Sequence, residues 1–339
     1  GSLAARAVQE AARPGRQSCQ PGGGRAGGND RHRHADRHAE PPDRQPATAG
    51  STADRLAIPH YVLDFENRFR ESVIDDFVDT YLAGATPIPC VRCNQTVKFR
   101  DLVARAHEIG ADCLATGHYV RRTMGPAGAE LHRAINDAKD QSYFLWETPA
   151  SVVSRLIFPL GDFDSKDDTR ALAREFGLHV ADKKDSTDLC FLGGGTKEEF
   201  LERNNVVSSG GNFVDTNGKV VGKHDGYTKY VTGQRAGIGG GTRYVLDVVH
   251  STGNIVVGSR EQASVRSINL RNARIDFNGS VENITAVTRY HSSPVTVEAI
   301  TGSGEDYNVT LRDSVFGAAK GQSCVFYRGD EVVGGGIIA

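Results

Sequence analysis

Apolar residues in the first half of the chain alternate between short continuous runs and helical spacing. The continuous runs predict a short strand over residues 58–64 and a buried strand over residues 112–116. Helical spacing predicts a helix over residues 69–82 and a second helix that Asn94 caps and that extends to about Ile109. The order strand, helix, loop, helix, strand is typical of a right-handed parallel α/β unit.

Ligands of such sheets bind beyond the carboxyl ends of the strands. Thr116, Gly117 and His118 follow the second predicted strand, so we expect them at a binding site. Two further helices are expected, one carrying residues 143–146 and an amphipathic one over residues 165–176.

From about Thr196 the pattern changes to short β-like runs separated by Gly, Asn and Asp turns, and it continues to Ile338. This alternation predicts a mostly β structure, as a barrel or small β domains. The chain is therefore expected to contain an atypical tail (1–50), an α/β domain (51–195), a small central β-rich domain (196–262) and a C-terminal β-barrel domain (263–339).

The first 50 residues include ten Ala, eight Arg, eight Gly and five Pro, but no Phe, Tyr, Trp or Ile. Such a composition buries too little apolar surface to offset the entropy of ordering, so a disordered tail is expected. A basic arm for nucleic acid, or loose metal binding by His32, His34 and His38, is the alternative.

The overall charge changes the picture little, because 40 Lys and Arg balance 42 Asp and Glu. A net charge of −2 gives no global basic field, so any nucleic acid must bind to local patches. No run of 18 apolar residues and no signal peptide is visible, which argues against a membrane partner. Six irregularly spaced cysteines do not form a disulfide scaffold, so we expect a cytoplasmic protein whose special cysteines serve chemistry.

Cys90 and Cys93 form a lone CxxC. A zinc site would need two more ligands, and His118 and Cys113 are the nearest candidates. Two unrelated loop cysteines are the simpler alternative. Cys93, however, is expected just before a helix N-terminus, where the helix dipole lowers the pKa of a thiol and favours the reactive thiolate.

Cys190 lies between Leu189 and Phe191, which suits a buried strand cysteine. Polar residues and glycines bracket this short apolar run, and Lys183 and Lys184 precede it, which suits a reactive thiolate instead. The residues alone leave both interpretations open.

Residues 86–99 resemble the TPNPCxxCNxxIKF signature of the tRNA-specific 2-thiouridylases. Further motifs of that family follow in the same order: ATGHY at 115–119, KDQSY at 139–143, FPLG at 158–161, ADKKDST at 181–187 with CF at 190–191, GKHDG at 222–226, TGQR at 232–235, RY at 289–290, GQ at 321–322 and GGG at 334–336. The resemblance covers about residues 52–338, and the shared order makes a chance match implausible.

The resemblance implies an adenine-nucleotide alpha-hydrolase-like parallel sheet domain, a small central domain and a C-terminal β-barrel. It implies that ATP, with Mg²⁺, activates the C2 oxygen of the wobble uridine of tRNA as an adenylate. A cysteine persulfide, loaded by a sulfur-donor protein, then delivers sulfur, and 2-thiouridine, AMP and pyrophosphate result.

By matching position, Cys190 would carry the persulfide, and Cys93 would free the sulfur and leave a Cys93–Cys190 disulfide to be reduced. Gly117 would contact ATP. Cys90 falls where some members have Asp, a possible proton acceptor. The residues implied in contacts with tRNA or the target base are Ile88, Pro89, Cys90, His118, Lys139, Asp140, Gln141, Arg289, Tyr290 and Gln322.

One departure from the family concerns its opening SGGxDSS loop, which binds pyrophosphate and has no match before Thr52. The Arg, Ala, Gly and Pro bias of the first 50 residues suits a shifted reading frame, which would leave the sheet incomplete and impair ATP binding. The alternatives to an active sulfurtransferase are a catalytically impaired tRNA-binding remnant, a zinc-stabilised RNA-binding module, and another ATP pyrophosphatase of the superfamily.

Overall fold

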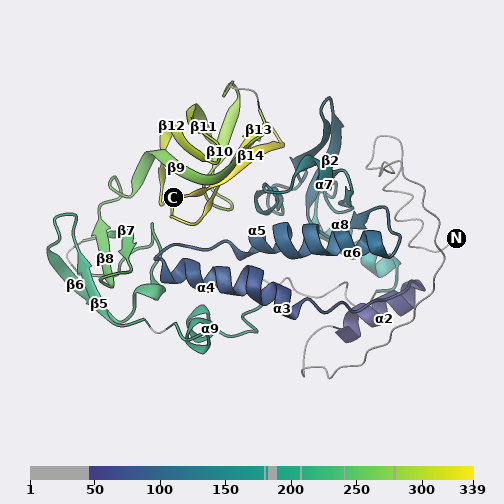
Figure 1. Ribbon diagram of the computed structural model, residues 1–339, viewed down its shortest axis with the longest axis horizontal. Helices are drawn as coiled ribbons and strands as arrows, with labels where there is room; N and C mark the ends of the chain where they lie inside the picture. The colour runs from purple at the N-terminus through teal and green to yellow at the C-terminus, as the bar shows by residue number, and fades with distance from the viewer. Residues whose placement is uncertain (1–45, 179–180, 182–188, 207, 240, 278–279) are drawn as a thin grey trace.

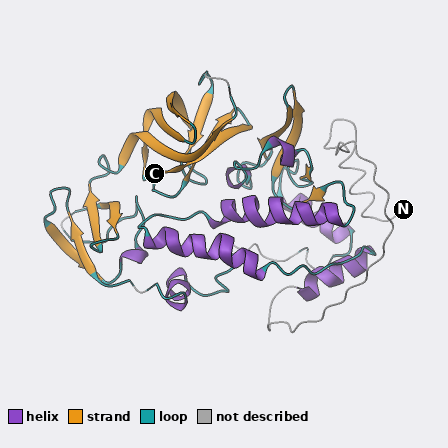
Figure 2. Cartoon of the chain, in the orientation of Figure 1, coloured by secondary structure: helices purple, strands orange, loops and turns teal. Residues whose placement is uncertain are grey.

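The computed structural model describes residues 46–178, 181, 189–206, 208–239, 241–277 and 280–339 (Figure 1). Most of the predicted tail, the three histidines within it, Lys183 and Lys184 lie outside the described residues. The described part is mixed α/β. Helices gather in one half of the molecule, and a barrel and a smaller sheet occupy the other (Figure 2).

Two long helical segments lie side by side beneath the barrel (Figure 2). The first joins α3 (Glu66–Phe69), η1 (Arg70–Ile74) and α4 (Asp75–Leu82), as predicted for residues 69–82. The second joins α5 (Pro89–Cys93), η2 (Asn94–Leu102) and α6 (Val103–Glu108). It starts five residues before the predicted cap because Pro89 occupies the first helical position, where a missing N–H costs nothing. Asn94 lies inside the helix, and its Nδ2 donates to the carbonyl of Phe144.

The parallel sheet consists, within the described residues, of β1 (Leu114–Ala115) and β4 (Leu156–Ile157). The predicted strand at 112–116 is therefore present but short, and Ala115 is exposed rather than buried. The predicted strand at 58–64 is wrong. That segment forms no strand or helix, and Tyr61 and Val62 are 67% and 76% exposed. Within the described residues this sheet has two strands of two residues each, which is small for a parallel α/β sheet.

Three further helices belong to this part of the chain. They are α2 (Pro46–Leu56), α7 (Ala150–Val153) and α8 (Lys166–Glu175). A capping box between Ser165 and Asp168 starts α8, and Gly177 follows its end with a φ of 65°, as expected for this amphipathic helix. The helix predicted at 143–146 shortens to a single 3-10 turn, η3 (Ser142–Phe144). A hairpin of β2 (Val120–Gly125) and β3 (Gly128–Arg133) was not predicted.

The central part combines α9 (Lys197–Arg203) and η4 (Tyr227–Lys229) with a four-stranded sheet. Its strand order is β6-β5-β8-β7, and the strands are β5 (Gly211–Val214), β6 (Val220–His224), β7 (Tyr244–Val249) and β8 (Asn254–Gly258). Phe213, Val245 and Ile255 form the centre of its own apolar core.

Six strands close the C-terminal barrel, because β13 pairs with both β10 and β14. These strands are β9 (Ser264–Ile275), β10 (Ile284–Val287), β11 (Val295–Ser303), β12 (Asp306–Phe316), β13 (Ser323–Arg328) and β14 (Glu331–Ile338). The prediction of a barrel is thereby confirmed. Trp146 packs into the core that the α/β part shares with β13 and β14, so the barrel has a defined position over the helices.

Candidate active site

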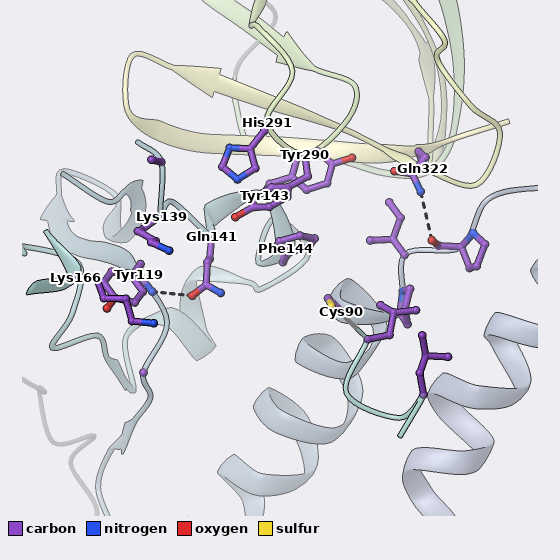
Figure 3. Close-up of a pocket in the computed structure, with 17 residues that line it drawn as sticks. Cys90, Tyr119, Lys139, Gln141, Tyr143, Phe144, Lys166, Tyr290, His291 and Gln322 are labelled. Atoms are coloured by element: carbon purple, nitrogen blue, oxygen red, sulfur yellow. Dashed lines mark hydrogen bonds between the residues drawn. The ribbon is translucent and has the colours of Figure 1, made fainter. Parts of the chain in front are cut away.

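Two adjoining cavities lie in the α/β part, and the larger one extends to the barrel. The larger, of about 780 Å³, is lined by residues from the loop before α5, from the KDQSY segment and from the barrel (Figure 3). The smaller, of about 180 Å³, lies against α5 and η2. Residues that line both cavities join them: Pro89, Cys90, Gln141, Phe144 and Leu189.

Three cysteines line the smaller cavity, Cys90, Cys93 and Cys190, and all three are free thiols. Cys90 and Cys190 are exposed, whereas Cys93 is half-buried. The structure thus brings together the two cysteines that the sequence singled out, although they are far apart in the chain. Cys190 lies in a turn after the undescribed segment rather than in a buried strand.

The expected cause of Cys93 reactivity is not the one found. Cys93 lies inside a continuous helix instead of before its start, so no free helix N-terminus faces it. Burial raises the pKa of the Cys93 thiol, and the Lys98 ammonium opposes this rise. Although Cys90 is exposed as a residue, the protein atoms around its sulfur desolvate the thiol and raise its pKa; the charge of Cys190 adds to the rise, and Lys98 again opposes it.

Lys98 is a cavity residue that the sequence reasoning missed, although it stands in the same motif as Cys93. Its Nζ lies 3.4 Å from His118 Nε2. Burial, and then the Lys98 charge, lower the pKa of His118 to about 3, so the imidazole is neutral at pH 7. An ammonium can only donate, so Nε2 is the acceptor and Nδ1–H donates to Thr116 Oγ1 over 2.9 Å.

Aromatic rings form one wall of the larger cavity (Figure 3). The Tyr290 ring lies 4.4 Å from that of Phe144 and 3.9 Å from that of His291, measured between centroids. Tyr290 also donates its hydroxyl to the carbonyl of Asp140 over 3.1 Å, which ties this barrel loop to the KDQSY segment.

Cationic side chains lie at the end of the larger cavity away from Cys90 (Figure 3). Lys139 and Lys166 are found there. Gly117 also lines the larger cavity. Gln141 accepts a hydrogen bond from the Tyr119 backbone N–H over 2.9 Å, which fixes the side chain between the two cavities. The larger cavity therefore has a cationic end, an aromatic wall and a thiol end.

Several predicted contact residues have other surroundings. His118 lines only the smaller cavity, whereas Ile88, although buried before α5, lines the larger one. The Asp140 carboxylate is 5% exposed and accepts from Ala134 N and from Ser142 N and Oγ, so it stabilises the local turn. Arg289 is exposed and outside both cavities.

Gln322 lines the larger cavity from the barrel side. Its Nε2 donates to the carbonyls of Thr86 and Pro87 over 3.2 and 3.3 Å. These bonds satisfy two backbone acceptors of the proline-rich loop, and Thr86 N–H donates to the carbonyl of Lys320 over 2.7 Å. Gln322 therefore fixes the loop that leads into α5 and its two cysteines.

In the described ranges no group of three or more His, Cys, Asp or Glu side chains is arranged to hold a metal ion, so the zinc-stabilised alternative gains no support. Across the same ranges, none of the helices is both long and apolar enough to cross a membrane.

Comparison with known proteins agrees with this architecture. Residues 29–194 match the tRNA methyl transferase HUP domain family, residues 198–259 the tRNA methyl transferase PRC-barrel domain family, and residues 261–338 the aminomethyltransferase beta-barrel domain family. The HUP and barrel assignments confirm the predicted fold class.

Curated relatives resemble the chain over most of its length. The tRNA-specific 2-thiouridylase MnmA of Rhodospirillum centenum is 46% identical over 306 residues, covering 86% of this chain and 77% of the relative. The enzymes of the same name from Paracoccus denitrificans and Rickettsia conorii are 45% and 44% identical, covering 86% of this chain and 77% and 80% of the relatives. With its motifs, its three domains and these relatives in agreement, the chain belongs to the tRNA-specific 2-thiouridylase family.

Proposed function

We propose that this chain is a tRNA-uridine 2-sulfurtransferase that thiolates the wobble uridine of tRNA in an ATP-dependent reaction. One observation carries the proposal: Cys93 and Cys190 line one small cavity that opens into a larger one with aromatic and cationic walls. Sulfur transfer between two thiols and a flipped base requires such an arrangement. Family membership supports the same activity.

The larger cavity suits an extruded nucleotide. Base-modifying enzymes take the target base out of the stack and hold it against aromatic or apolar side chains. Tyr290 and Phe144 would provide that surface, and Lys139 and Lys166 would attract the phosphate groups. Pro89 and Cys90 at the junction of the two cavities would face the base.

Cys190 and Cys93 would act in sequence in the sulfur transfer. Cys190 is exposed, so a sulfur-donor protein can load it as a persulfide. The terminal sulfur attacks C2 of the adenylated uridine, and AMP leaves with the former C2 oxygen. The Cys93 thiolate attacks Sγ of Cys190 and breaks the S–S bond, which leaves sulfur on the tRNA and a Cys93–Cys190 disulfide.

ATP is the co-substrate in this proposal, and Gly117 is the predicted contact. A Cβ at Gly117 would meet no atom closer than 3.8 Å, so the surroundings of Gly117 are open. The sequence, however, contains no SGGxDSS loop, and the described parallel sheet has only β1 and β4. These two observations favour a second candidate function, a tRNA-binding protein with impaired ATP chemistry.

The deciding experiment measures AMP release from ATP by the purified full chain, with and without tRNA, together with thiolation of that tRNA on an organomercury gel. Release of AMP that depends on tRNA, accompanied by thiolation, supports the sulfurtransferase. Cys190→Ser is the matched control, because it should abolish thiolation while AMP release continues. Binding of tRNA with no AMP release by the wild-type chain would support the second candidate.

A further inference from the structure

Cys90 is a third thiol in the smaller cavity, and the proposed reaction uses only the other two. Cys90 and Cys93 are three residues apart within α5, a spacing that places two side chains on the same face of a helix. Cys190 reaches the same cavity from a different part of the chain. Three free thiols in about 180 Å³ can exchange disulfide partners.

Charged groups in the cavity affect the pKa values of Cys90 and Cys93. The charge of Cys190 raises the pKa of both Cys90 and Cys93, and Lys98 lowers both. A Cys190 held in a disulfide carries no charge, whereas Lys98 keeps its own. Oxidation of Cys190 therefore favours the Cys90 thiolate at the stage when a nucleophile is needed.

We propose that Cys90 is the resolving cysteine of this enzyme. Its thiolate attacks Sγ of Cys93 in the Cys93–Cys190 disulfide, the bond between Cys93 and Cys190 breaks, and Cys190 leaves as a thiolate. A Cys90–Cys93 disulfide forms, so the exchange needs no oxidant or reductant. An external dithiol protein then supplies two electrons to reduce it. The inference rests on the proposed function for the origin of the first disulfide.

The start of α5 is suited to this exchange. Pro87 and Pro89 have no N–H, and the first turn closes through bonds from Val91 N and Arg92 N to Ile88 O, over 3.1 and 3.5 Å. Helical neighbours at this spacing have Cβ atoms about 5–6 Å apart, and a disulfide needs about 4 Å. Because Cys90 is the second residue of α5, only the first helical turn has to shift for the two Cβ atoms to reach that separation.

The exchange also returns Cys190 to its free thiol form. Cys190 is the exposed thiol that the donor must reload, and it is released without waiting for an external reductant. Cys93 remains in the disulfide, but its partner is now the exposed Cys90 instead of the persulfide carrier Cys190.

Disulfide mapping tests this without tRNA or ATP. The reduced full chain is oxidised with stoichiometric diamide, alkylated with N-ethylmaleimide and digested with trypsin. Arg92 separates Cys90 from Cys93, and Lys184 and Lys197 bound the peptide of Cys190, so each sulfur reports separately. We expect the Cys90–Cys93 pair with alkylated Cys190 in the wild-type chain, and the Cys93–Cys190 pair in Cys90→Ser.

The rate of recovery provides a second measurement. After oxidation, alkylation of Cys190 should need added thioredoxin in Cys90→Ser but not in the wild-type chain, a difference of at least about tenfold in its rate. A wild-type map in which Cys190 remains within a disulfide, to either partner, overturns the inference. If thiolation of tRNA fails but the map shows Cys90–Cys93, the proposed function is wrong, whereas the disulfide exchange from Cys190 to Cys90 is supported.

Discussion

Trp146 donates its Nε1–H to Ser323 Oγ over 2.8 Å and thereby ties the segment after the KDQSY motif to strand β13 of the barrel. Tyr143 donates to the carbonyl of the same serine over 2.9 Å. Both aromatic side chains are buried, so these bonds satisfy polar groups that would otherwise lie unpaired in the shared core. They hold the barrel wall of the larger cavity at a defined distance from its α/β wall.

Gly335→Ala should destabilise this interface. A Cβ at Gly335 would lie 2.8 Å from Trp146 Cδ2 and 2.9 Å from Cys324 O, so the ring and the barrel must separate. Overpacking of this kind costs about 1–3 kcal/mol. Urea unfolding followed by tryptophan fluorescence measures it, because the chain has one Trp. Gly239→Ala, with no atom within 4 Å of its Cβ, is the matched control and should leave the midpoint unchanged.

Lys98→Met should make the Cys93 thiol less acidic. Lys98 lowers the pKa of this thiol against the effect of burial, so loss of the ammonium lets the pKa rise further. We expect the pH midpoint of iodoacetamide alkylation at Cys93 to move to higher pH. Lys98→Arg keeps the charge and should stay near the wild-type midpoint. Equal midpoints for Lys98→Met and the wild-type chain would contradict the assignment.

Acid should destabilise the chain through His118. Its pKa is about 3 in the folded chain against about 6.5 in an unfolded one, so unfolding takes up a proton as pH falls below 6.5. The resulting loss of stability develops between about pH 6.5 and pH 3, and amounts to about 2 kcal/mol at pH 5.

Urea unfolding at pH 7 and pH 5 tests this dependence. His118→Gln should reduce the pH-dependent loss by about the same amount, because glutamine takes up no proton. His107→Gln, at an exposed position on α6, is the matched control. An unchanged pH dependence in His118→Gln would show that His118 is not the responsible group.

Tyr290→Ala should weaken tRNA binding, and Tyr290→Phe should retain most of it. The ring packs 4.4 Å from Phe144 on the aromatic wall, and loss of one stacking ring costs about 1–3 kcal/mol. Filter binding of tRNA at fixed salt concentration should show at least about a fivefold rise in Kd for the alanine variant. A Kd for Tyr290→Ala equal to that of the wild-type chain would show that this aromatic wall does not contribute to tRNA binding.

The sequence predicted elements well where local chemistry specifies them. The Ser165–Asp168 capping box and Gly177 define α8, and the short β-like runs separated by turns indicated a mostly β C-terminal region. The prediction failed at residues 58–64, because an apolar run becomes a strand only when another strand pairs with it. It also placed the start of the second long helix at Asn94, because Asn is a good cap, whereas Pro89 had already begun the helix.

The sequence by itself determined the family and the cysteines that matter, because motif spacing and residue chemistry are local properties. Only the tertiary structure decided that Cys90 joins Cys93 and Cys190 in one cavity, and that Lys98 lies beside His118 there. The tertiary structure also shows that burial and Lys98, instead of the expected helix dipole, are the main influences on the pKa of the Cys93 thiol. These relationships depend on how distant segments pack and on how much water the packing excludes, and neither is encoded in the spacing of residues along the chain.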